Sequence, residues 1–496
     1  MILPFRRLTH CLFAICLMSI CATAQAADDL IVRATAAMEA ATSRAQADPT
    51  HPLFHIASPA QWMNDPNGPI YYKGYYHMFY QLHPFSEQGG PKYWGHVRSR
   101  DLVKWEHLPI AIAPSPELGE SEIWSGCATI NGEGKPMIFY TSIAPGKSAQ
   151  THAEQWASLG DDDLINWHKS PANPVLTEAL HDGKKIYDWR DPFIFRDKKQ
   201  TFMVLGGNLN EAKGGQAVVN IYEAQNAGLT QWKYRGVLFT IPGQNARTAE
   251  CPNFFKLGDK WILFVSPYGK VNYFVGDFDA KTCRFEPQQH GLLDVGPNFY
   301  APNTMQLADG RRLVWGWVTG FPGGHGWNGC LTVPRELSLS KSGELRQIPA
   351  PQLTKLRGKP AELRNVALKN ESAPLVLPLP KTNALEIQAE IDLQTAESLT
   401  VTLKRGATNS RPMIMTFSRS EFKMPGGQSP LTFDKSKPKL NLRLFIDRSV
   451  LEVFANDTVC ATKHIETMDD NATLEISAQG NAKAKLVQAW PMKTIW

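Results

Sequence analysis

Three acidic residues of this chain stand in short polar clusters, each with a proline one or two positions later. The clusters are Asn64-Asp65-Pro66, Arg190-Asp191-Pro192 and Glu250-Cys251-Pro252. Carboxyl groups that meet in one pocket can pass protons and attack an electrophilic carbon. Proline supplies no N–H to a strand ladder and holds the preceding residue extended, so such clusters are expected where strands start. The three acids can act together only if the fold brings these starts to one place.

The clusters belong to a longer repeat. Trp124-Ser125-Gly126 and Tyr300-Ala301-Pro302-Asn303 occupy the same phase, which makes five clusters in all. Each is followed by a turn and an apolar strand, within roughly ten residues, the scale of one strand plus its turn. The apolar strands are Tyr75–Gln81, Pro136–Thr141, Thr201–Gly206, Trp261–Ser266 and Arg312–Val318. Their spacing of about 50–65 residues is close to the repeat lengths of β-propeller blades.

Equal phase predicts that all five clusters lie on the same strand of a four-stranded blade. The innermost strand of a blade borders the central channel, so the clusters would converge on one pocket at its mouth. The alternative is that Asn64–Gly68 is only a strong turn, because each of its residue types favours turns. Five clusters in phase, three of them acidic, favour the shared pocket. We therefore predict a propeller over residues 50–345.

The pattern of strands and turns in the sequence changes after Glu336. Residues 346–372 are predicted to be a linker and residues 373–496 a second domain, because short alternating strands separated by turn residues are typical of a β-sandwich. The expected strands are Leu385–Ile391, Leu399–Leu403, Met413–Phe417, Leu440–Ile446, Leu451–Phe454, Leu474–Ile476 and Leu486–Trp490. The predicted fold class is all-β: a five-bladed β-propeller followed by a C-terminal β-sandwich. Only Leu30–Gln46 has helical periodicity after the N-terminal segment.

The first residues have the features of an export signal. Arg6 and Arg7 precede an apolar run, Cys11–Ile20, and a small-x-small site at Ala24-Gln25-Ala26. A membrane anchor is the alternative, but the run is too short to span a bilayer comfortably. We predict a signal peptide over residues 1–26, a secreted or periplasmic protein, and no membrane association after removal of the signal.

Composition argues against several other classes of protein. The net charge is only +5 and no stripe of Lys or Arg is present, so nucleic acid is not an expected partner. Of the 8 cysteines, three leave with the predicted signal, so at least one of the other five must stay unpaired. No spacing typical of metal ligands occurs, and neither a metal nor another cofactor is expected. The sequence leaves the oligomeric state open.

From about Pro52 onward, the chain resembles glycoside hydrolase family 32, which contains invertases, inulinases and levanases. Trp62–Gly68 (WMNDPNG) resembles the family signature, and the other matching segments, in family order, are Phe79–Gln81, Trp94–His96, Trp124–Gly126, Trp189–Pro192, Ala249–Pro252 and Phe445–Phe454. The family fold is a five-bladed propeller followed by a β-sandwich, in agreement with the repeat. The resemblance implies retaining hydrolysis of terminal β-D-fructofuranosyl residues of sucrose or fructans such as inulin and levan, through a covalent fructosyl-enzyme intermediate.

The resemblance also implies a role for each matching residue. Asp65 would be the nucleophile, Glu250 the general acid/base and Asp191 the stabiliser of the transition state. The expected lining of the sugar pocket is Asn64, Gln81, Trp94, Trp124, Ser125, Arg190 and Trp315. A retaining mechanism needs its two working carboxyl groups about 5–5.5 Å apart, whereas inversion needs about 6.5–9.5 Å.

Departures from the family pattern bear on the rim of the pocket. His83 stands where an Asn is common, and Gly89-Gly90 stands about where a Trp is common. Cys127 also replaces a more usual Ser or Ala. The choice among sucrose, inulin and levan, and between terminal and internal cleavage, therefore stays open.

Three other functions fit parts of the pattern. A fructosyltransferase would use the same three carboxylates with a sugar as acceptor in place of water. A non-catalytic sugar-binding propeller would not need all three acids. The related arabinan-cleaving propellers also use three acids, but the intact Trp62–Gly68 motif argues against them.

Overall fold

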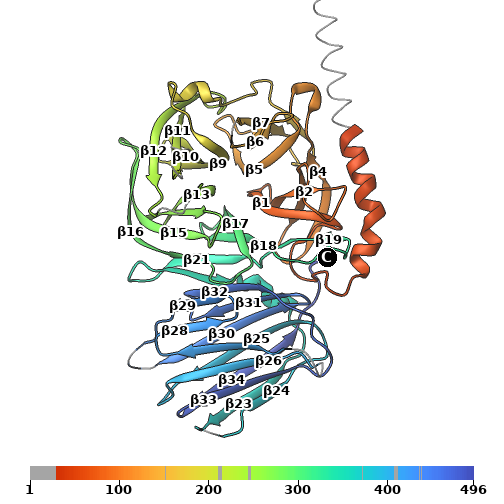
Figure 1. Ribbon diagram of the computed structural model, residues 1–496, viewed down its shortest axis with the longest axis vertical. Coiled ribbons are helices and arrows are strands. Elements are labelled where there is room, and N and C mark those ends of the chain that lie inside the picture. The colour runs from red at the N-terminus through yellow and green to blue at the C-terminus, as the bar shows by residue number, and fades with distance from the viewer. Residues whose placement is uncertain are drawn as a thin grey trace, which may run out of the picture.

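The computed structural model describes residues 29–150, 152–209, 215–243, 247–370, 372–406, 411–434, 436 and 438–496. The predicted signal peptide over 1–26 lies outside these residues. A helix over 29–47 confirms the expected helical stretch, and it lies along the side of the propeller (Figure 1). The propeller and the β-sandwich follow it in chain order, as predicted (Figure 1).

Five antiparallel sheets form the blades. Blade 1 contains β1 (Gln61–Tyr72), β2 (Tyr75–His83), β3 (Tyr93–Ser99) and β4 (Trp105–Ile112), and blade 2 contains β5 (Glu122–Ile130), β6 (Pro136–Ile143), β7 (Glu154–Gly160) and β8 (Trp167–Lys169). Blade 3 contains β9 (Tyr187–Asp197), β10 (Gln200–Leu209), β11 (Gln216–Ala224) and β12 (Trp232–Thr240). The short 3-10 helices η1 (Pro116–Leu118) and η2 (Glu178–His181) lie in connections.

The last two blades complete the ring. Blade 4 contains β13 (Glu250–Leu257), β14 (Lys260–Ser266), β15 (Asn272–Asp279) and β16 (Arg284–Leu292). Blade 5 contains β17 (Phe299–Gln306), β18 (Arg312–Val318), β21 (Arg335–Leu339) and β22 (Leu345–Pro349), with β20 (Cys330–Leu331) beside β18. The ring closes where β19 (Trp327–Asn328) pairs in parallel with β1. The five predicted apolar strands are the second strands β2, β6, β10, β14 and β18.

The first strand of every blade borders the central channel, since β1, β5, β9, β13 and β17 each contact the next around the ring. All five predicted clusters lie on these strands. At each cluster the pairing with the second strand shifts register, as between Met63 and Pro66 on β1 and between Glu250 and Asn253 on β13. Such a bulge bends the strand and re-aims its side chains. The repeated phase in the sequence is therefore a repeated bulge in the structure.

Two six-stranded sheets make up the sandwich. The first contains β23 (Ala361–Leu368), β34 (Ala482–Pro491), β25 (Ala384–Asp392), β30 (Lys439–Asp447), β31 (Val450–Ala455) and β32 (Val459–His464). The second contains β24 (Leu375–Pro378), β33 (Thr473–Gln479), β26 (Ser398–Lys404), β27 (Met413–Ser418), β28 (Glu421–Met424) and β29 (Gly427–Pro430). Alternating apolar residues of both sheets face one buried core.

The predicted linker over 346–372 is wrong as a single connecting segment. It contains the end of β22, the 3-10 helix η4 (Pro351–Leu356) and β23, which pairs with β34 in the sandwich. The propeller therefore runs to Pro349 and the first strand of the sandwich begins at Ala361, outside the predicted limits of 345 and 373. β23 escaped notice because it is an edge strand with mostly exposed or half-exposed residues, so it lacks a clear apolar alternation.

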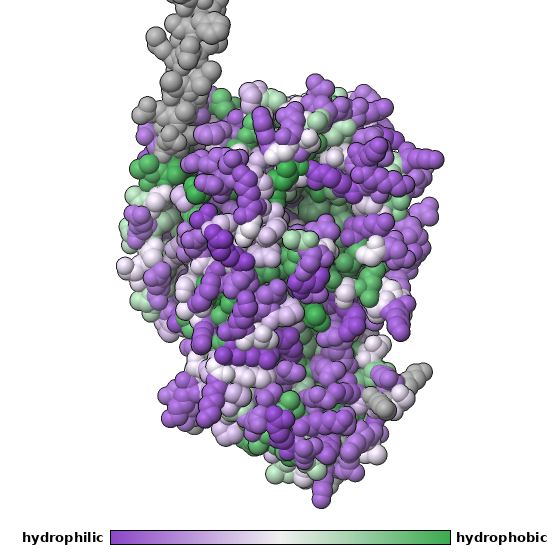
Figure 2. Space-filling view, turned by 180° about the vertical axis from the view of Figure 1, so that it is seen from behind, coloured by the Kyte–Doolittle hydropathy of each residue, from purple (hydrophilic) through white to green (hydrophobic). Residues whose placement is uncertain are grey.

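The two domains share a buried interface. One hydrophobic cluster joins propeller residues such as Met63 and Leu331 to Phe445 and Phe454 of the sandwich. Hydrophilic side chains dominate the outer surface seen in Figure 2, with hydrophobic ones scattered among them. Among the described residues, no helix is long and apolar enough to cross a membrane.

A chain of buried charges crosses the same interface. Arg335 of blade 5 pairs with Asp294 at 2.9 Å and with Glu452 of the sandwich at 2.6 Å. Glu452 also accepts a hydrogen bond from His55 at 3.0 Å, and His55 contacts Asp447 at 2.8 Å. Arg335 does not pair with its chain neighbour Glu336. Adjacent strand residues point to opposite faces, so Arg335 turns inward while Glu336 pairs with Arg311 at 2.7 Å.

His55 makes the interface sensitive to pH. Burial alone would lower its pKa, but its hydrogen bonds to Asp447 and Glu452 and their charges raise the pKa from 6.5 to about 9. A raised pKa in the folded state contributes stability that is complete below pH 6.5 and is lost as pH rises through about 9.

We therefore expect His55→Gln to lower the free energy of unfolding most at pH 6. The difference in this free energy between the variant and the parent, called the gap, should shrink toward pH 9.5. Urea unfolding at a series of pH values measures this gap. His168→Gln, at an exposed position, is the matched control. A gap that stays constant or widens with pH would contradict the charged role of His55.

Candidate active site

The bulged first strands bring the three predicted acids to one end of the channel. Asp65 comes from β1, Asp191 from β9 and Glu250 from β13. The thiol of Cys251 marks where the first two meet, since its Sγ lies 3.6 Å from Oδ2 of Asp65 and 3.6 Å from Oδ2 of Asp191. Arg190 connects the third acid, Glu250, to this pair, because its guanidinium contacts both Glu250 and Asp191. Three blades thus supply one acidic pocket.

A run of polar side chains orients the carboxylate of Asp65. Ser125 donates to its Oδ2 at 2.6 Å, and the amide of Asn64 donates to its Oδ1 at 3.1 Å. Gln81 supports both donors: its Nε2 donates to the Ser125 hydroxyl at 2.6 Å, and its Oε1 accepts from the Asn64 amide. Asn64, Gln81 and Ser125 are buried, so their hydrogen bonds are shielded from water. The arrangement fixes Asp65 as an acceptor facing the pocket.

Arg190 is the cation of the site. It is almost completely buried, and its Nη2 donates to Oε1 of Glu250 at 2.6 Å, while its Nη1 donates to Asp188 at 2.7 Å. Its Nε lies 3.8 Å from Oδ2 of Asp191. A rigid guanidinium with several donors can hold such carboxylates in fixed relative positions.

Asp191 is held by backbone geometry. Its φ of 64° and the φ of 47° at Cys251 are left-handed values that non-glycine residues seldom adopt. With these angles, the Cys251 N–H donates to Oδ2 of Asp191 at 2.8 Å, and the Asp191 N–H donates to Thr141 at 2.9 Å. Strained backbone of this kind persists where surrounding structure enforces it and is frequent at active sites.

Burial and mutual repulsion shift the proton affinities of the acids. Burial raises the pKa of Asp65, and the charge of Glu250 adds to the rise, while the hydrogen bond from Ser125 opposes it. Burial raises the pKa of Asp191 to about 7, against the opposing charge of Arg190. Neighbouring carboxyl groups whose surroundings shift their pKa values differently can take different roles in proton transfer and catalysis.

The structure separates the predicted aromatic walls into two groups. Trp124 is partly exposed, and Arg190 Cζ lies 5.7 Å from the centre of its ring. Trp94 is fully buried and donates its N–H to the Trp124 carbonyl at 3.1 Å, so it supports the wall from behind. Trp315 is also fully buried, within the hydrophobic core. The prediction that Trp94 and Trp315 present a face to a sugar is wrong, because neither ring is accessible.

Trp317 is a partly exposed indole on the same strand as Trp315. Both lie on β18 two positions apart, but Trp317 pairs with Tyr300 nearer the mouth and is partly exposed. Its ring meets that of Trp62 edge-on, with centroids 5.7 Å apart, and Trp62 donates to Asn64 at 2.8 Å. Two residues along a strand keep the same face but move the ring from the core to the rim.

Sequence reasoning missed two tyrosines beside Glu250. The Tyr300 hydroxyl donates to Oε2 of Glu250 and accepts the Tyr268 N–H at 3.0 Å. The Tyr268 hydroxyl accepts from Arg190 at 2.6 Å, and its side chain is exposed. Tyr300 belongs to the fifth polar cluster, so the repeat in the sequence could have indicated that it lies at the site. Tyr268 follows β14 in a loop with no distinguishing pattern.

At His83 and Gly89-Gly90, where the sequence departs from the family pattern, few side chains reach the rim of the pocket. Gly90 packs against the His83 ring, which a Cβ at that position would meet at 2.6 Å. His83 is buried and hydrogen-bonds the Pro91 carbonyl at 2.9 Å, so it braces the loop. Lys92 lies 5.6 Å from the centre of the Trp62 ring. Phe85 of the same loop is exposed, and its ring centroid lies 6.0 Å from that of His83.

Histidines and cysteines form no competing centre in the part of the chain that the structure describes. No group of three or more His, Cys, Asp or Glu residues there could hold a metal ion. His77 and His96 hydrogen-bond each other at 3.0 Å inside blade 1, and burial lowers the pKa of His77 to about 4. The five cysteines after the predicted signal are all free and buried.

Comparisons with known proteins identify relatives along nearly the whole described chain. A model of the glycosyl hydrolases family 32 N-terminal domain matches residues 55–349, and a model of the family 32 C terminal matches residues 352–491. The levanase of Bacillus subtilis is 31% identical over 516 residues, which covers 92% of this chain and 72% of that protein. A sucrose-6-phosphate hydrolase of Escherichia coli is 31% identical over 447 residues, which covers 82% of this chain and 87% of that protein.

Solved structures agree with the family models. The GH32 beta-fructofuranosidase of Bombyx mori superposes with a TM-score of 0.78 at 26% identity, covering 94% of this chain and 99% of that chain. Fructan 1-exohydrolase IIa of Cichorium intybus has the same fold, with a TM-score of 0.77 at 24% identity over 90% of this chain and 98% of that chain.

The buried charge of Asp191 should destabilise the protein at alkaline pH. Its pKa of about 7 exceeds the ordinary 3.8, so the folded state binds a proton that the unfolded chain has released, and stability falls as pH rises from about 4 to 7. We expect Asp191→Asn to melt at a higher temperature than the parent at pH 8, with the difference vanishing near pH 4. Differential scanning calorimetry at both pH values measures this effect.

Asp259→Asn, at an exposed turn position, is the control and should leave the melting temperature unchanged at both pH values. An Asp191→Asn protein that melts below the parent at pH 8 would contradict the argument, because the buried carboxylate would then be stabilising.

Proposed function

The chain belongs to glycosyl hydrolase family 32, and on that premise we propose that it hydrolyses terminal β-D-fructofuranosyl residues of sucrose or fructans with retention at the anomeric carbon. As a member of this family it is a glycoside hydrolase, and its relatives include a levanase and a sucrose-6-phosphate hydrolase. The observation that carries the proposal is the meeting of the three acids at one channel mouth, where Cys251 contacts Asp65 and Asp191, and Arg190 contacts Asp191 and Glu250.

In the first step, Asp65 attacks C2 of the fructosyl unit while Glu250 donates a proton to the leaving oxygen. The C2–O bond breaks through an oxocarbenium-like state, and an ester bond forms between Asp65 and C2. Ser125 and Asn64 hold the carboxylate of Asp65 in one orientation, so little reorganisation is needed at the moment of attack. The leaving group departs as the neutral remainder of the sucrose or fructan.

In the second step, Glu250 accepts a proton from water, and the water oxygen attacks C2. The ester bond to Asp65 breaks, which returns its carboxylate and releases fructose. Between the two steps Glu250 is ionised, and Arg190 and Tyr300 donate to its two oxygens. Charge-assisted hydrogen bonds of this kind stabilise the ionised acid until it takes up the proton.

Asp191 works through the sugar hydroxyl groups. The backbone N–H of Cys251 occupies its Oδ2, which leaves Oδ1 to accept from hydroxyls of the fructosyl ring. Such hydrogen bonds strengthen as positive charge develops on the ring, so they stabilise the transition state more than the bound substrate. Arg190 keeps this acid positioned beside Glu250.

We also propose that the protein is exported, to the periplasm or out of the cell. Support comes from the charged start, apolar run and small-x-small site over residues 1–26, which lie outside the described structure. Cell fractionation with N-terminal sequencing of the mature protein tests this. An N-terminus following Ala26 supports export, whereas an intact chain in the cytoplasm would overturn it.

Substitutions at the acids should separate their roles. We expect Asp65→Ala and Glu250→Ala each to lower kcat on sucrose by at least about 100-fold, because each removes an interaction made in the transition state. With an aryl fructoside, whose leaving group needs no proton, Glu250→Ala should recover much of the first step and respond to added azide, whereas Asp65→Ala should not.

Asp259→Asn serves again as the exposed control, with kcat unchanged. The assignment is wrong if Asp65→Ala hydrolyses sucrose or inulin as fast as the parent. It is also wrong if the aryl substrate rescues Asp65→Ala and leaves Glu250→Ala inactive, since that result would exchange the two roles.

Stereochemistry and products test the reaction itself. Retention predicts that β-fructofuranose appears first, before mutarotation, when sucrose hydrolysis is followed by NMR. Parallel assays on sucrose, inulin and levan, with products resolved by chain length, should release free fructose from chain ends. Initial α-fructose would contradict retention, and longer fructans at high sucrose would show transfer in place of hydrolysis.

A further inference from the structure

A second cavity lies at the other end of the central channel. Its volume is about 810 Å³, and its walls come from the later parts of the same first strands, such as Gly68–Tyr71 of β1 and Asn303–Gln306 of β17. Buried asparagines separate it from the acids: Asn303 donates to the carbonyls of Pro66 and Gly126 across the channel. The cavity is therefore distinct from the pocket that holds the three carboxylates.

Positive charge dominates the lining of this cavity. Arg196, Lys199 and Arg312 line it, and Glu223 is the acid among its lining residues. Glu223 is already engaged, because Arg235 pairs with it and Gln200 donates to it at 2.7 Å. The three cations of the lining therefore have no free carboxylate partner within it.

Arg312 pairs with no carboxylate among the described residues, whereas several other buried or half-buried arginines do. Arg190, Arg335, Arg357 and Arg443 are each paired with carboxylates. Arg312 is partly buried. Its Nη1 donates to the Thr304 hydroxyl at 3.0 Å, and its guanidinium Cζ lies 4.3 Å from the centre of the Phe255 ring, but no anion in the described part of the chain neutralises it. Burial lowers its pKa to about 10, as expected for a guanidinium without a neighbouring anion. Burial of an unneutralised cation is unfavourable unless a partner compensates it.

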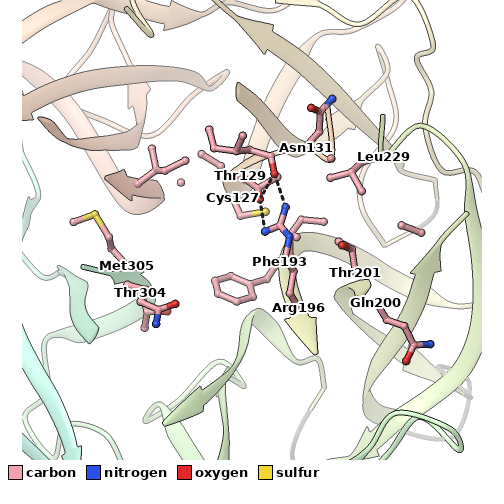
Figure 3. Close-up of a pocket in the computed structure, with 18 of the residues that line it drawn as sticks. Cys127, Thr129, Asn131, Phe193, Arg196, Gln200, Thr201, Leu229, Thr304 and Met305 are labelled. Carbon is pink, nitrogen blue, oxygen red and sulfur yellow. Dashed lines mark hydrogen bonds between the residues drawn. The ribbon is translucent and has the colours of Figure 1, made fainter. Parts of the chain in front are cut away.

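Arg196 is held in place over the same cavity. Its Nη1 donates to the Thr129 hydroxyl at 3.1 Å, and its Nη2 donates to the Ile130 carbonyl. Figure 3 shows Arg196 reaching from β9 toward Thr129, with the Phe193 ring of the same strand beside it and Thr304 on the opposite side of the view. Its side chain is exposed, yet these bonds restrict it, which reduces the entropy lost when a ligand binds.

We propose that this cavity binds a small molecule bearing a phosphate group. Guanidinium groups hold phosphate oxygens with paired, charge-assisted hydrogen bonds, and Arg196, Arg312 and Lys199 supply the charge. The volume leaves room for an organic part beyond the phosphate. The amides of Gln200, Gln225 and Asn226 in the same lining can hydrogen-bond its hydroxyl groups. This site is independent of the hydrolytic function proposed above.

Calorimetric titration at low salt tests the proposal with the full-length protein. The probes are inorganic phosphate and glucose 6-phosphate, with uncharged glucose as the negative control. We expect both phosphates to bind and the double variant Arg196→Met/Arg312→Met to lose at least tenfold in affinity. Arg364→Met, at an exposed sandwich position, should bind like the parent. Tighter binding of the ester than of inorganic phosphate identifies a phosphorylated small molecule, and equal affinities identify free phosphate.

Hydrogen–deuterium exchange on the unaltered protein locates the site without any substitution. Inorganic phosphate should protect residues 128–131, 194–201 and 303–312, and leave residues 64–65 and 190–191 unchanged. No phosphate binding by the parent, undiminished affinity in a folded double variant, or protection confined to the acidic pocket would each overturn the proposal.

Discussion

Three carboxylates meet in one pocket that holds a buried guanidinium, and the fold must keep these like charges together against their mutual repulsion. Arg190 contacts Glu250 directly and lies 3.8 Å from Asp191, while Asp65 depends on neutral donors. Burial is the main cause of the raised pKa values of Asp65 and Asp191, and the charge of Glu250 adds to both. A pocket of this kind can exist only where the surrounding structure is stable enough to enforce it.

The enforcement comes from the geometry of the ring. Each first strand carries a bulge at the same height, and the bulges turn side chains from separate blades toward one point. The sandwich reinforces the ring from below through the buried Arg335–Glu452 pair and a shared hydrophobic cluster. The charged interface and the acidic pocket thus lie in one continuous structure, although the interface residues do not contact the acids.

Much of this arrangement could be predicted from the sequence because it repeats. Five clusters in phase with five apolar strands predicted the number of blades and the strand that carries the acids. Position along a strand was harder to predict. Trp315 and Trp317 share a face of β18, and only the depth of each in the channel decides that Trp315 is core and Trp317 is rim. Tyr268 and the partners of Arg335 depend on loop and domain packing, which leave no local pattern. β23 was missed because an exposed edge strand has little apolar alternation.

The central claim is that Asp65, Asp191 and Glu250 surround a single fructosyl unit. A crystal structure of the Glu250→Gln protein soaked with sucrose tests it most directly. We expect the anomeric carbon to face Asp65, the glycosidic oxygen to lie beside residue 250 and ring hydroxyl groups to bind Asp191. Sucrose bound productively away from these side chains, or bound with its glycosidic oxygen out of reach of residue 250, would contradict it.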